Sequence, residues 1–353
     1  MRALVVLTLI MTFDAVSAKP SAPANGDRAY VDWVVELAHN IGSSHDAGQL
    51  AMSAALREHA CAGGSNDCFP THQWHAMEME AERGARPALL ALLANVAAER
   101  KEGDIAQWER VAAEDPKNAY PLILIAAAHW KEGDHSRALE LLREATQLER
   151  MDDYFSSIVG YVKAAVKGHE PTVEQLYPCA RESLPHHAGA VEIENAVIFH
   201  IAVDIGISPH VGDLSKLCRQ DDDAWDATRA ALCWRAGQQL RTATSLLNRS
   251  FGIALQKFST RDEAVRSRLA GEQQAQSDKL HGALWWTDDG GNVKARQSAA
   301  TFWMEQLVRN GEVAAGDALI QHFGPTPETP AQRDTRVNAF MAKTQRCYSR
   351  FDQ

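Results

Sequence analysis

Apolar residues recur at the three- and four-residue spacing of an amphipathic α-helix along almost the whole chain. The first stripe runs from Val31 to a stop near Gly42, and a second helix is predicted from a cap at Ser43 or Ser44 to the glycines at 63 and 64. The remaining helices predicted from spacing and caps are 87–100, 154–167, 189–203, 223–237, 239–258, 262–284, 295–310, 313–323 and 331–348. Strict alternation of apolar and polar residues, which indicates strands, is absent. The pattern therefore predicts an all-α fold built as an array of antiparallel helical hairpins.

A tetrapeptide repeats within this helical pattern. Lys-Glu-Gly-Asp occurs at 101–104 and again at 131–134, so that Gly103 and Gly133 lie 30 residues apart. Each copy follows an Ala-rich segment and precedes an amphipathic one. Repeats of this length indicate stacked helical hairpins, each too small to bury its own apolar face. The alternative is that Gly-Asp ends one helix and caps the next, as any helical hairpin can do.

The segment around the second copy, from Asn118 to Arg150, resembles a tetratricopeptide repeat, a helix–turn–helix unit of about 34 residues. Gly133 falls at the turn, and Leu142 falls at the large position between the helices. Alanines stand at the small positions where the two helices approach: Ala126, Ala138 and Ala145. The segment departs from the family where Trp, Tyr and Pro are usual, at Leu122, His129 and Arg150.

The resemblance is good over this one repeat and fair over two, which together make about a fifth of the chain. It implies a right-handed superhelix, a solenoid, with a concave groove that binds another protein or an extended peptide. The candidate residues for the binding surface are His129, Trp130, Trp285 and Trp286. The last two are adjacent and cannot both face the core of one helix, so one of them is expected at the surface. Alternatively, the pair straddles a helix end and packs on both sides of it.

The predicted organisation has six parts. These are a signal peptide (1–18), an N-terminal helical segment (19–84), tetratricopeptide-like hairpins (85–168), a further helical array or second helical domain (169–323), a Pro-rich linker (324–330) and a C-terminal capping helix (331–353).

The first eighteen residues have the three parts of an export signal. Arg2 provides the positive charge, residues 3–13 are apolar, and Val16-Ser17-Ala18 places small residues before a cleavage site. The alternative is a short N-terminal membrane anchor. No later apolar stretch reaches the roughly 20 residues that a transmembrane helix needs. The sequence therefore predicts a periplasmic or secreted protein with no membrane span after cleavage.

Six cysteines agree with an oxidising compartment. Two pairings are local in sequence: Cys218 with Cys233, and Cys61 with Cys68. A Cys179–Cys347 bridge follows only by elimination.

Charge and motifs exclude several classes of function. A net charge of −10 argues against a nucleic-acid-binding protein, which needs a concentrated basic surface. The chain has no Gly-rich phosphate loop, GxSxG or HExxH, so no cofactor is predicted and enzymatic activity is not favoured. Glu182-Ser183 matches the catalytic acid of lytic transglycosylases in two letters, but Arg181 and the residues that follow differ from that family. The run Ser43-Ser44-His45-Asp46 contains the letters of a catalytic triad, although neighbours at a helix start more often cap it.

One pair of histidines has metal-ligand spacing. His72 and His75 lie three residues apart, so both imidazoles face one side of a helix, with Met79 one turn further on. Imidazole and thioether ligands suit copper. Two ligands do not by themselves make a site, and the methionines fit an apolar helix face equally well.

The function that these observations favour is an exported, non-enzymatic scaffold or adaptor that binds another protein or an extended peptide. One alternative is a cell-envelope hydrolase with an active site among the helices of the second half. The other is a copper- or metal-handling protein that uses His72 and His75.

Overall fold

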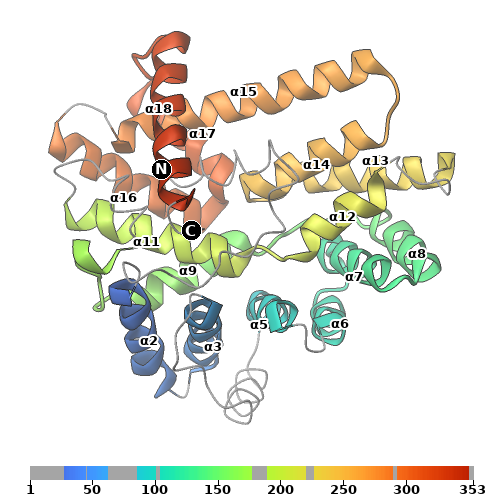
Figure 1. Ribbon diagram of the computed structural model, residues 1–353, viewed down its shortest axis with the longest axis horizontal. Helices are drawn as coiled ribbons and strands as arrows, with labels where there is room; N and C mark the ends of the chain where they lie inside the picture. Colours follow the sequence, from blue (N-terminus) through green and yellow to red (C-terminus); the bar gives the residue numbers. More distant parts are fainter. Residues whose placement is uncertain are drawn as a thin grey trace. The chain divides into compact units, whose positions relative to one another are not determined.

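The computed structural model describes residues 28–44, 46–62, 86–100, 104–176, 189–219, 226–288 and 292–349 (Figure 1). In these ranges the chain forms fifteen α-helices and one 3₁₀ turn and contains no strand, so the predicted all-α array is confirmed. The predicted signal peptide, His72, His75 and Glu182-Ser183 lie outside the described residues. Among the described helices, none has the length and apolar character that crossing a membrane requires.

The chain divides into two compact units, and each unit combines segments that are far apart in sequence. Unit 1 comprises residues 1–84, 156–205 and 277–353, and unit 2 comprises residues 85–155 and 206–276. The helices of unit 2 are α5 (Pro87–Arg100), α6 (Asp104–Glu114), α7 (Ala119–Glu132), α8 (His135–Ala145), α12 (His210–Cys218), α13 (Ala227–Leu240), α14 (Leu246–Phe258) and the first half of α15 (Glu263–Asp288). Those of unit 1 are α2 (Arg28–Gly42), α3 (Ala47–Ala62), α9 (Phe155–Val166), η1 (Val173–Gln175), α11 (Ala190–Gly206), the rest of α15, α16 (Val293–Asn310), α17 (Glu312–Phe323) and α18 (Pro330–Ser349).

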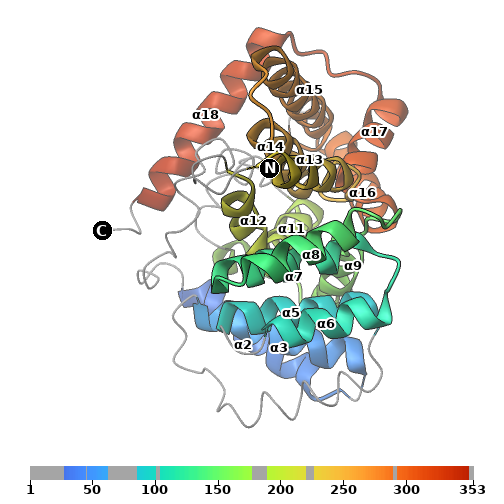
Figure 2. The ribbon, with the colours of Figure 1, turned by 90° about the vertical axis from the view of Figure 1, so that its right-hand side faces the viewer.

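Unit 2 is built on helical hairpins. The pairs α5–α6, α7–α8 and α13–α14 each pack side by side, and α6 and α12 both pack against α7 (Figure 2). Caps explain where the central hairpin begins and turns. The Asn118 side chain accepts a hydrogen bond from the Tyr120 N–H at the start of α7, and Gly133, with φ +90°, ends that helix. Asp134 then caps α8 by accepting from the Arg137 N–H, so the second Lys-Glu-Gly-Asp copy forms the turn of the hairpin.

The α13–α14 hairpin corrects one predicted boundary. The range 239–258 was expected to be one helix, but α13 continues to Leu240 and α14 begins only after Ser245, whose hydroxyl caps it. Two glycines allow the helices to approach closely, because a Cβ on Gly237 would lie 2.6 Å from the Gly252 carbonyl oxygen. Cys218 and Cys233 form the predicted disulfide and join α12 to α13.

A buried carboxylate anchors the start of α14. Asp153 is 1% exposed and accepts hydrogen bonds from the Ser245 N–H and hydroxyl (3.0 and 2.6 Å) and from the Asn248 amide (2.9 Å). The hydroxyl of Thr244 donates to it as well. This cluster fixes the turn between α13 and α14, because all of these donors share the single Asp153 carboxylate as their acceptor.

Unit 1 contains two hairpins, α2–α3 and α16–α17. The Asn195 amide of α11 donates to the Ala300 carbonyl of α16 at 2.9 Å, and the rings of Phe199 and Trp303 meet at 5.5 Å. The α2–α3 hairpin is joined to the segment after α9 by the Trp33 indole N–H, which donates to the His169 carbonyl at 3.0 Å. These contacts position α3 and α11, which carry the candidate site.

Candidate metal centre

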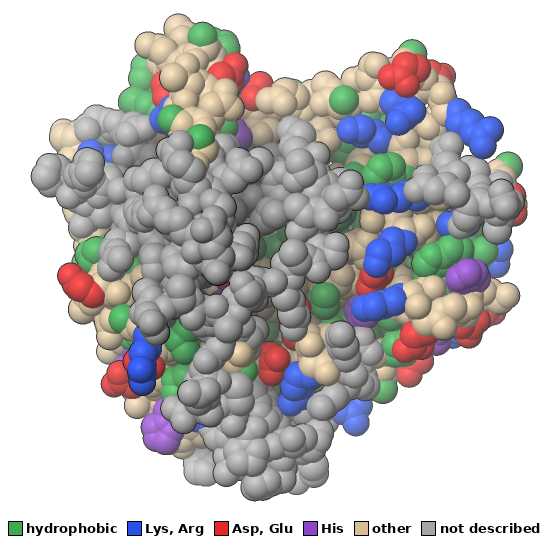
Figure 3. Space-filling model, in the orientation of Figure 1, with side chains coloured by type: hydrophobic (Ala, Val, Ile, Leu, Met, Phe, Trp, Pro, Cys, Tyr) green, Lys and Arg blue, Asp and Glu red, His purple; other side chains and the backbone are tan. Residues whose placement is uncertain are grey.

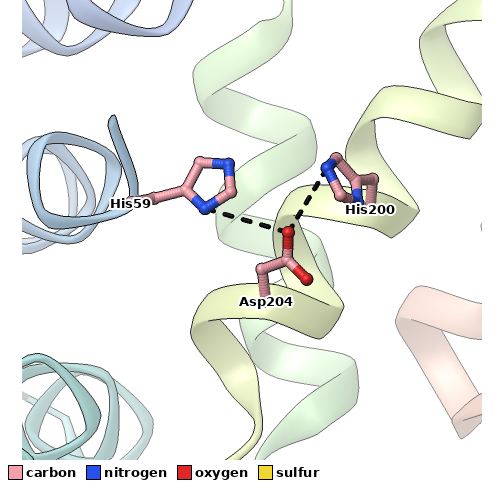
Figure 4. Close-up of side chains that lie close together, drawn as sticks. All are labelled: His59, His200 and Asp204. Atoms are coloured by element: carbon pink, nitrogen blue, oxygen red, sulfur yellow. Dashed lines mark ion pairs between the residues drawn. The ribbon is translucent and has the colours of Figure 1, made fainter. Parts of the chain in front are cut away.

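Three ligand-forming side chains from two helices of unit 1 converge on one point (Figure 4). His200 and Asp204 lie four residues apart on α11, so one face of that helix presents both side chains. His59 comes from the last turn of α3. One ligand atom from each residue lies within 4.8 Å of the others.

A single carboxylate oxygen is the centre of the cluster. Asp204 Oδ2 lies 3.3 Å from His200 Nε2 and 3.8 Å from His59 Nδ1. The two imidazoles are largely buried, with side chains 11% and 14% exposed, whereas the Asp204 side chain is 37% exposed. The site is therefore lined by protein on the histidine side and open to solvent on the carboxylate side.

Tyr30 of α2 supports the histidines from behind. Its hydroxyl lies 2.8 Å from His59 Nε2, the ring nitrogen that does not face Asp204. Its ring packs against those of His59 and His200, with centroids 5.8 and 5.7 Å apart. Such a hydrogen bond fixes the tautomer of a metal-binding histidine, because an Nε2–H that donates to the tyrosine oxygen places the lone pair that can bind a metal on Nδ1.

The donor set suits a divalent transition metal. Two imidazoles and one carboxylate match the ligands of catalytic zinc sites and of non-haem iron sites, and no soft sulfur ligand is among the three residues. Zinc bonds of about 2.0–2.2 Å put tetrahedral ligand atoms about 3.3 Å apart. His200 and Asp204 already have this separation, and His59 Nδ1 lies 3.8 Å from the same carboxylate oxygen.

No known protein family, curated protein or solved structure matches this chain.

The histidine pair predicted from sequence, His72 and His75, lies outside the described residues, so its role as a metal site stays a prediction. The triad-like run at 43–46 acts as a cap where it is described. The Ser44 hydroxyl accepts from the Asp46 N–H, and the Asp46 carboxylate accepts from the Gln49 N–H at the start of α3. Cys61, two residues after His59, is disulfide-bonded, while its predicted partner Cys68 lies outside the described residues, as does Cys179.

The predicted groove residues of α7 make contacts within unit 2. The Trp130 ring stacks on His135 at 3.9 Å between centroids, and the guanidinium carbon of Arg229 lies 4.2 Å from the Trp130 ring centre. His129 Nδ1 lies 4.0 Å from the Asp134 carboxylate. Their role in binding a partner stays a prediction.

Trp285 and Trp286 belong to an aromatic cluster in unit 1. Their rings meet edge to face at 4.9 Å, and the Trp286 indole donates to the Gly324 carbonyl at 2.9 Å. The Phe323 ring lies 5.6 Å from Trp286, and Phe302 lies 5.9 Å from Phe323. Both tryptophans are half-buried and lie within the last turns of α15, and their role in binding a partner stays a prediction.

A second ionic cluster, in unit 2, is internally paired. Lys131 and Lys216 approach the Asp213 carboxylate of α12 at 3.2 and 3.0 Å. Burial raises the pKa of Asp213, but hydrogen bonds from His210 and Lys216 and the charge of Lys131 outweigh burial and lower that pKa below its usual range. Figure 3 shows Lys and Arg side chains gathered over unit 2 on the face that it displays. Because the Asp213 carboxylate is already paired with Lys131 and Lys216, we assign this cluster a structural role.

Sequence reasoning missed the three metal-site residues and Tyr30. The predicted helix 189–203 contained His200 but ended one residue before Asp204, so the four-residue spacing of the pair went unused. The four-residue spacing of His200 and Asp204 was the one local signal for the site that the sequence contained. No local pattern indicates that α3 reaches α11, because His59 and His200 are separated by more than a hundred residues.

Proposed function

We propose that this chain binds one divalent transition-metal ion at His59, His200 and Asp204, and that Zn²⁺ is the appropriate probe. The observation that carries the proposal is the convergence of three ligand atoms within 4.8 Å from two helices of one compact unit. Two neutral imidazoles and one carboxylate leave a bound Zn²⁺ with a net charge of +1. That charge favours water or an anion as a fourth ligand.

Three protein ligands are characteristic of zinc sites that keep an open position, whereas structural zinc sites are closed by four. The 37% exposure of the Asp204 side chain gives that position access to solvent. The proposed function is therefore metal handling with an exchangeable ligand. It belongs to the metal-handling class considered from sequence, with different residues.

Titration of Zn²⁺ into the oxidised chain from Lys19 onward, followed by calorimetry, tests the proposal. We expect one saturable site per chain, and Asp204→Ala or His200→Ala weakens it by about a hundredfold or more because a direct ligand is lost. The matched control is His39→Ala, which removes an exposed histidine of α2 and leaves the affinity unchanged.

A variant of the sequence-predicted pair, His72→Ala with His75→Ala, completes the test. Unchanged affinity in this double variant supports the assignment to His59, His200 and Asp204. Loss of binding in the double variant, with binding retained in Asp204→Ala and His200→Ala, overturns it.

We further propose that the protein is exported and that Asn118 to Arg150 is a tetratricopeptide-like repeat. The Cys218–Cys233 disulfide and the disulfide-bonded state of Cys61 support export, because disulfides persist in oxidising compartments. The Asn118 cap and the Gly133 turn support the repeat. Peptide binding by that repeat has less support, because α7 packs against α6, α8 and α12 and its residues 119–121 and 123–128 are buried.

A further inference from the structure

The C-terminal helix α18 meets unit 1 through one narrow stripe of side chains. Among the side chains of this helix that the structure describes, only Arg333, Arg336 and Val337 are not exposed, and none is fully buried. These three lie three and four residues apart, so they share one face of the helix. The described part of α18 therefore docks through two arginines and a valine, and not through an apolar core.

This stripe meets the C-terminal part of α15, which α18 crosses (Figure 1). Arg333 pairs with Asp278 of α15 at 3.2 Å, and the Arg336 guanidinium donates to the His281 carbonyl of α15 at 3.2 Å. Both contacts advance by three residues on each helix, so the face of α15 that carries Asp278 and His281 is the face toward α18. Arg336 also donates to the Glu328 carboxylate, just before α18, at 2.8 and 2.9 Å.

His281 is the buried titratable group at this contact. The residue is 6% exposed, and its Nε2 is buried without a hydrogen-bond partner. Burial and the charges of Arg336 and Arg333 lower the pKa of His281 to about 4, and Asp278 acts in the opposite direction. The imidazole under α18 is therefore neutral at pH 7, and its charged form is the one that this position disfavours.

The end of α15 is held to unit 1 by contacts that do not involve α18. Leu280 and Leu284 are 4% and 1% exposed, and a Cβ on Gly316 of α17 would lie 3.2 Å from the Leu280 side chain. Lys279 of α15 pairs with Asp317 of α17, so these two charges are matched with each other. A change at the contact between α15 and α18 therefore leaves the packing of α15 on α17 in place.

We propose that α18 is an acid-released helix: a proton on His281 adds a third positive charge beside Arg333 and Arg336, and α18 leaves α15. Charging the docked imidazole removes it from water and sets it against two guanidinium groups, and opening relieves both costs. Asp278 and Glu328 are already paired with these arginines. Because the open state binds the proton more tightly, acidification shifts the equilibrium towards the open state.

Hydrogen exchange of the oxidised chain from Lys19 onward, followed by mass spectrometry at pH 7 and pH 5, tests the proposal. With a His281 pKa of about 4 when α18 is docked and 6.5 when it is open, the open population is expected to rise about twentyfold between these pH values. The protection factors of residues 330–339, corrected for the intrinsic exchange rate at each pH, are expected to fall by the same factor. The α16–α17 hairpin of the same unit is the reference, and its amides are expected to stay at least about tenfold better protected.

Variants of His281 separate its titration from that of the carboxylates. His281→Leu and the polar His281→Gln both remove the proton-binding group, and the protection of residues 330–339 is expected to change less than about twofold between the two pH values. Asp278 and Glu328 are present in the wild type and in both variants, so the difference reports His281. His39→Leu, which removes an exposed histidine of α2, is expected to keep the full change.

Two results would overturn the proposal. An equal pH response in the wild type and in the His281 variants would show that another group drives the opening. Protection of residues 330–339 equal to that of the α16–α17 hairpin at pH 5 would show that α18 opens only when the whole unit unfolds.

Discussion

Two aspartates, one in each unit, illustrate opposite uses of a carboxylate. Asp153 in unit 2 is 1% exposed and is surrounded by hydroxyl and amide donors from the start of α14. Asp204 in unit 1 has a side chain that is 37% exposed and faces ring nitrogens of two histidines. The first is satisfied by hydrogen bonds, and the second is one of three converging ligands.

The comparison contrasts a carboxylate enclosed by hydrogen-bond donors with the carboxylate that we propose to bind a metal. Donors around Asp153 leave it no lone pair to offer a cation, so its cluster contributes to folding. Around Asp204 the partners are imidazoles, each of which has a nitrogen that can bind a metal when neutral. Solvent access at Asp204 also lets an ion enter. Partner chemistry, more than proximity to other polar groups, distinguishes the two roles.

The largest expected effect comes from removing the structural carboxylate. Asp153→Ala leaves several buried donors without an acceptor, and we expect the free energy of unfolding of unit 2 to fall by about 4 kcal/mol. Zn²⁺ affinity is expected to stay unchanged. Urea unfolding with calorimetry measures both quantities, and the neighbouring Asp152→Ala, with its side chain 37% exposed, serves as the control. A loss below about 1 kcal/mol in Asp153→Ala would contradict the structural role.

His281 of unit 1 is buried, as Asp153 is, but it is a titratable side chain outside the candidate site. Burial and the charges of Arg336 and Arg333 on α18 together lower the pKa of His281 to about 4, against a raising effect of Asp278. Because the folded-state pKa lies below the unfolded value of 6.5, the unfolded state binds more protons between these two values. Stability is therefore expected to fall as the pH drops from about 6.5 towards 4.

The matched variant for this effect is His281→Leu, which removes the titration. Between pH 7 and pH 5, the wild type is expected to lose about 2 kcal/mol more of its free energy of unfolding than the variant. Urea midpoints of both proteins at the two pH values measure the difference. Equal losses would show that His281 does not titrate in this range.

The smallest expected effect concerns the residue behind the ligands. Tyr30→Phe keeps the ring packing and removes the hydroxyl that lies 2.8 Å from His59 Nε2. We expect Zn²⁺ affinity to fall about tenfold, since groups that orient a metal ligand typically contribute that much. Calorimetry measures it, with Tyr154→Phe in unit 2 as a hydroxyl-deletion control. An unchanged affinity in Tyr30→Phe would show that the hydroxyl does not orient His59.

Local sequence signals predicted the helices well where caps and breakers were strong. Pro87 and Gly103 delimited the predicted helix 87–100, and α5 spans Pro87–Arg100 as expected. The helix α12 was missed although Val211, Leu214 and Leu217 recur at helical spacing, because it is only nine residues long and too few positions carry the pattern. The prediction of one helix over 239–258 was wrong, because the turn at 241–245 contains neither glycine nor proline to mark it.

The candidate site depended on information that no local pattern contains. The spacing of His200 and Asp204 was readable from the sequence, but the approach of His59 is a property of tertiary packing. The unit that holds the site is assembled from three separate stretches of chain. Prediction from the sequence therefore gave the helices and none of the three ligand residues.

The most direct test of the account is anomalous diffraction from crystals of the zinc-loaded chain, recorded on both sides of the zinc absorption edge. The account predicts one strong peak about 2.0–2.2 Å from His59 Nδ1, His200 Nε2 and an Asp204 carboxylate oxygen. A zinc peak bound elsewhere, with no density between these three side chains, would contradict it.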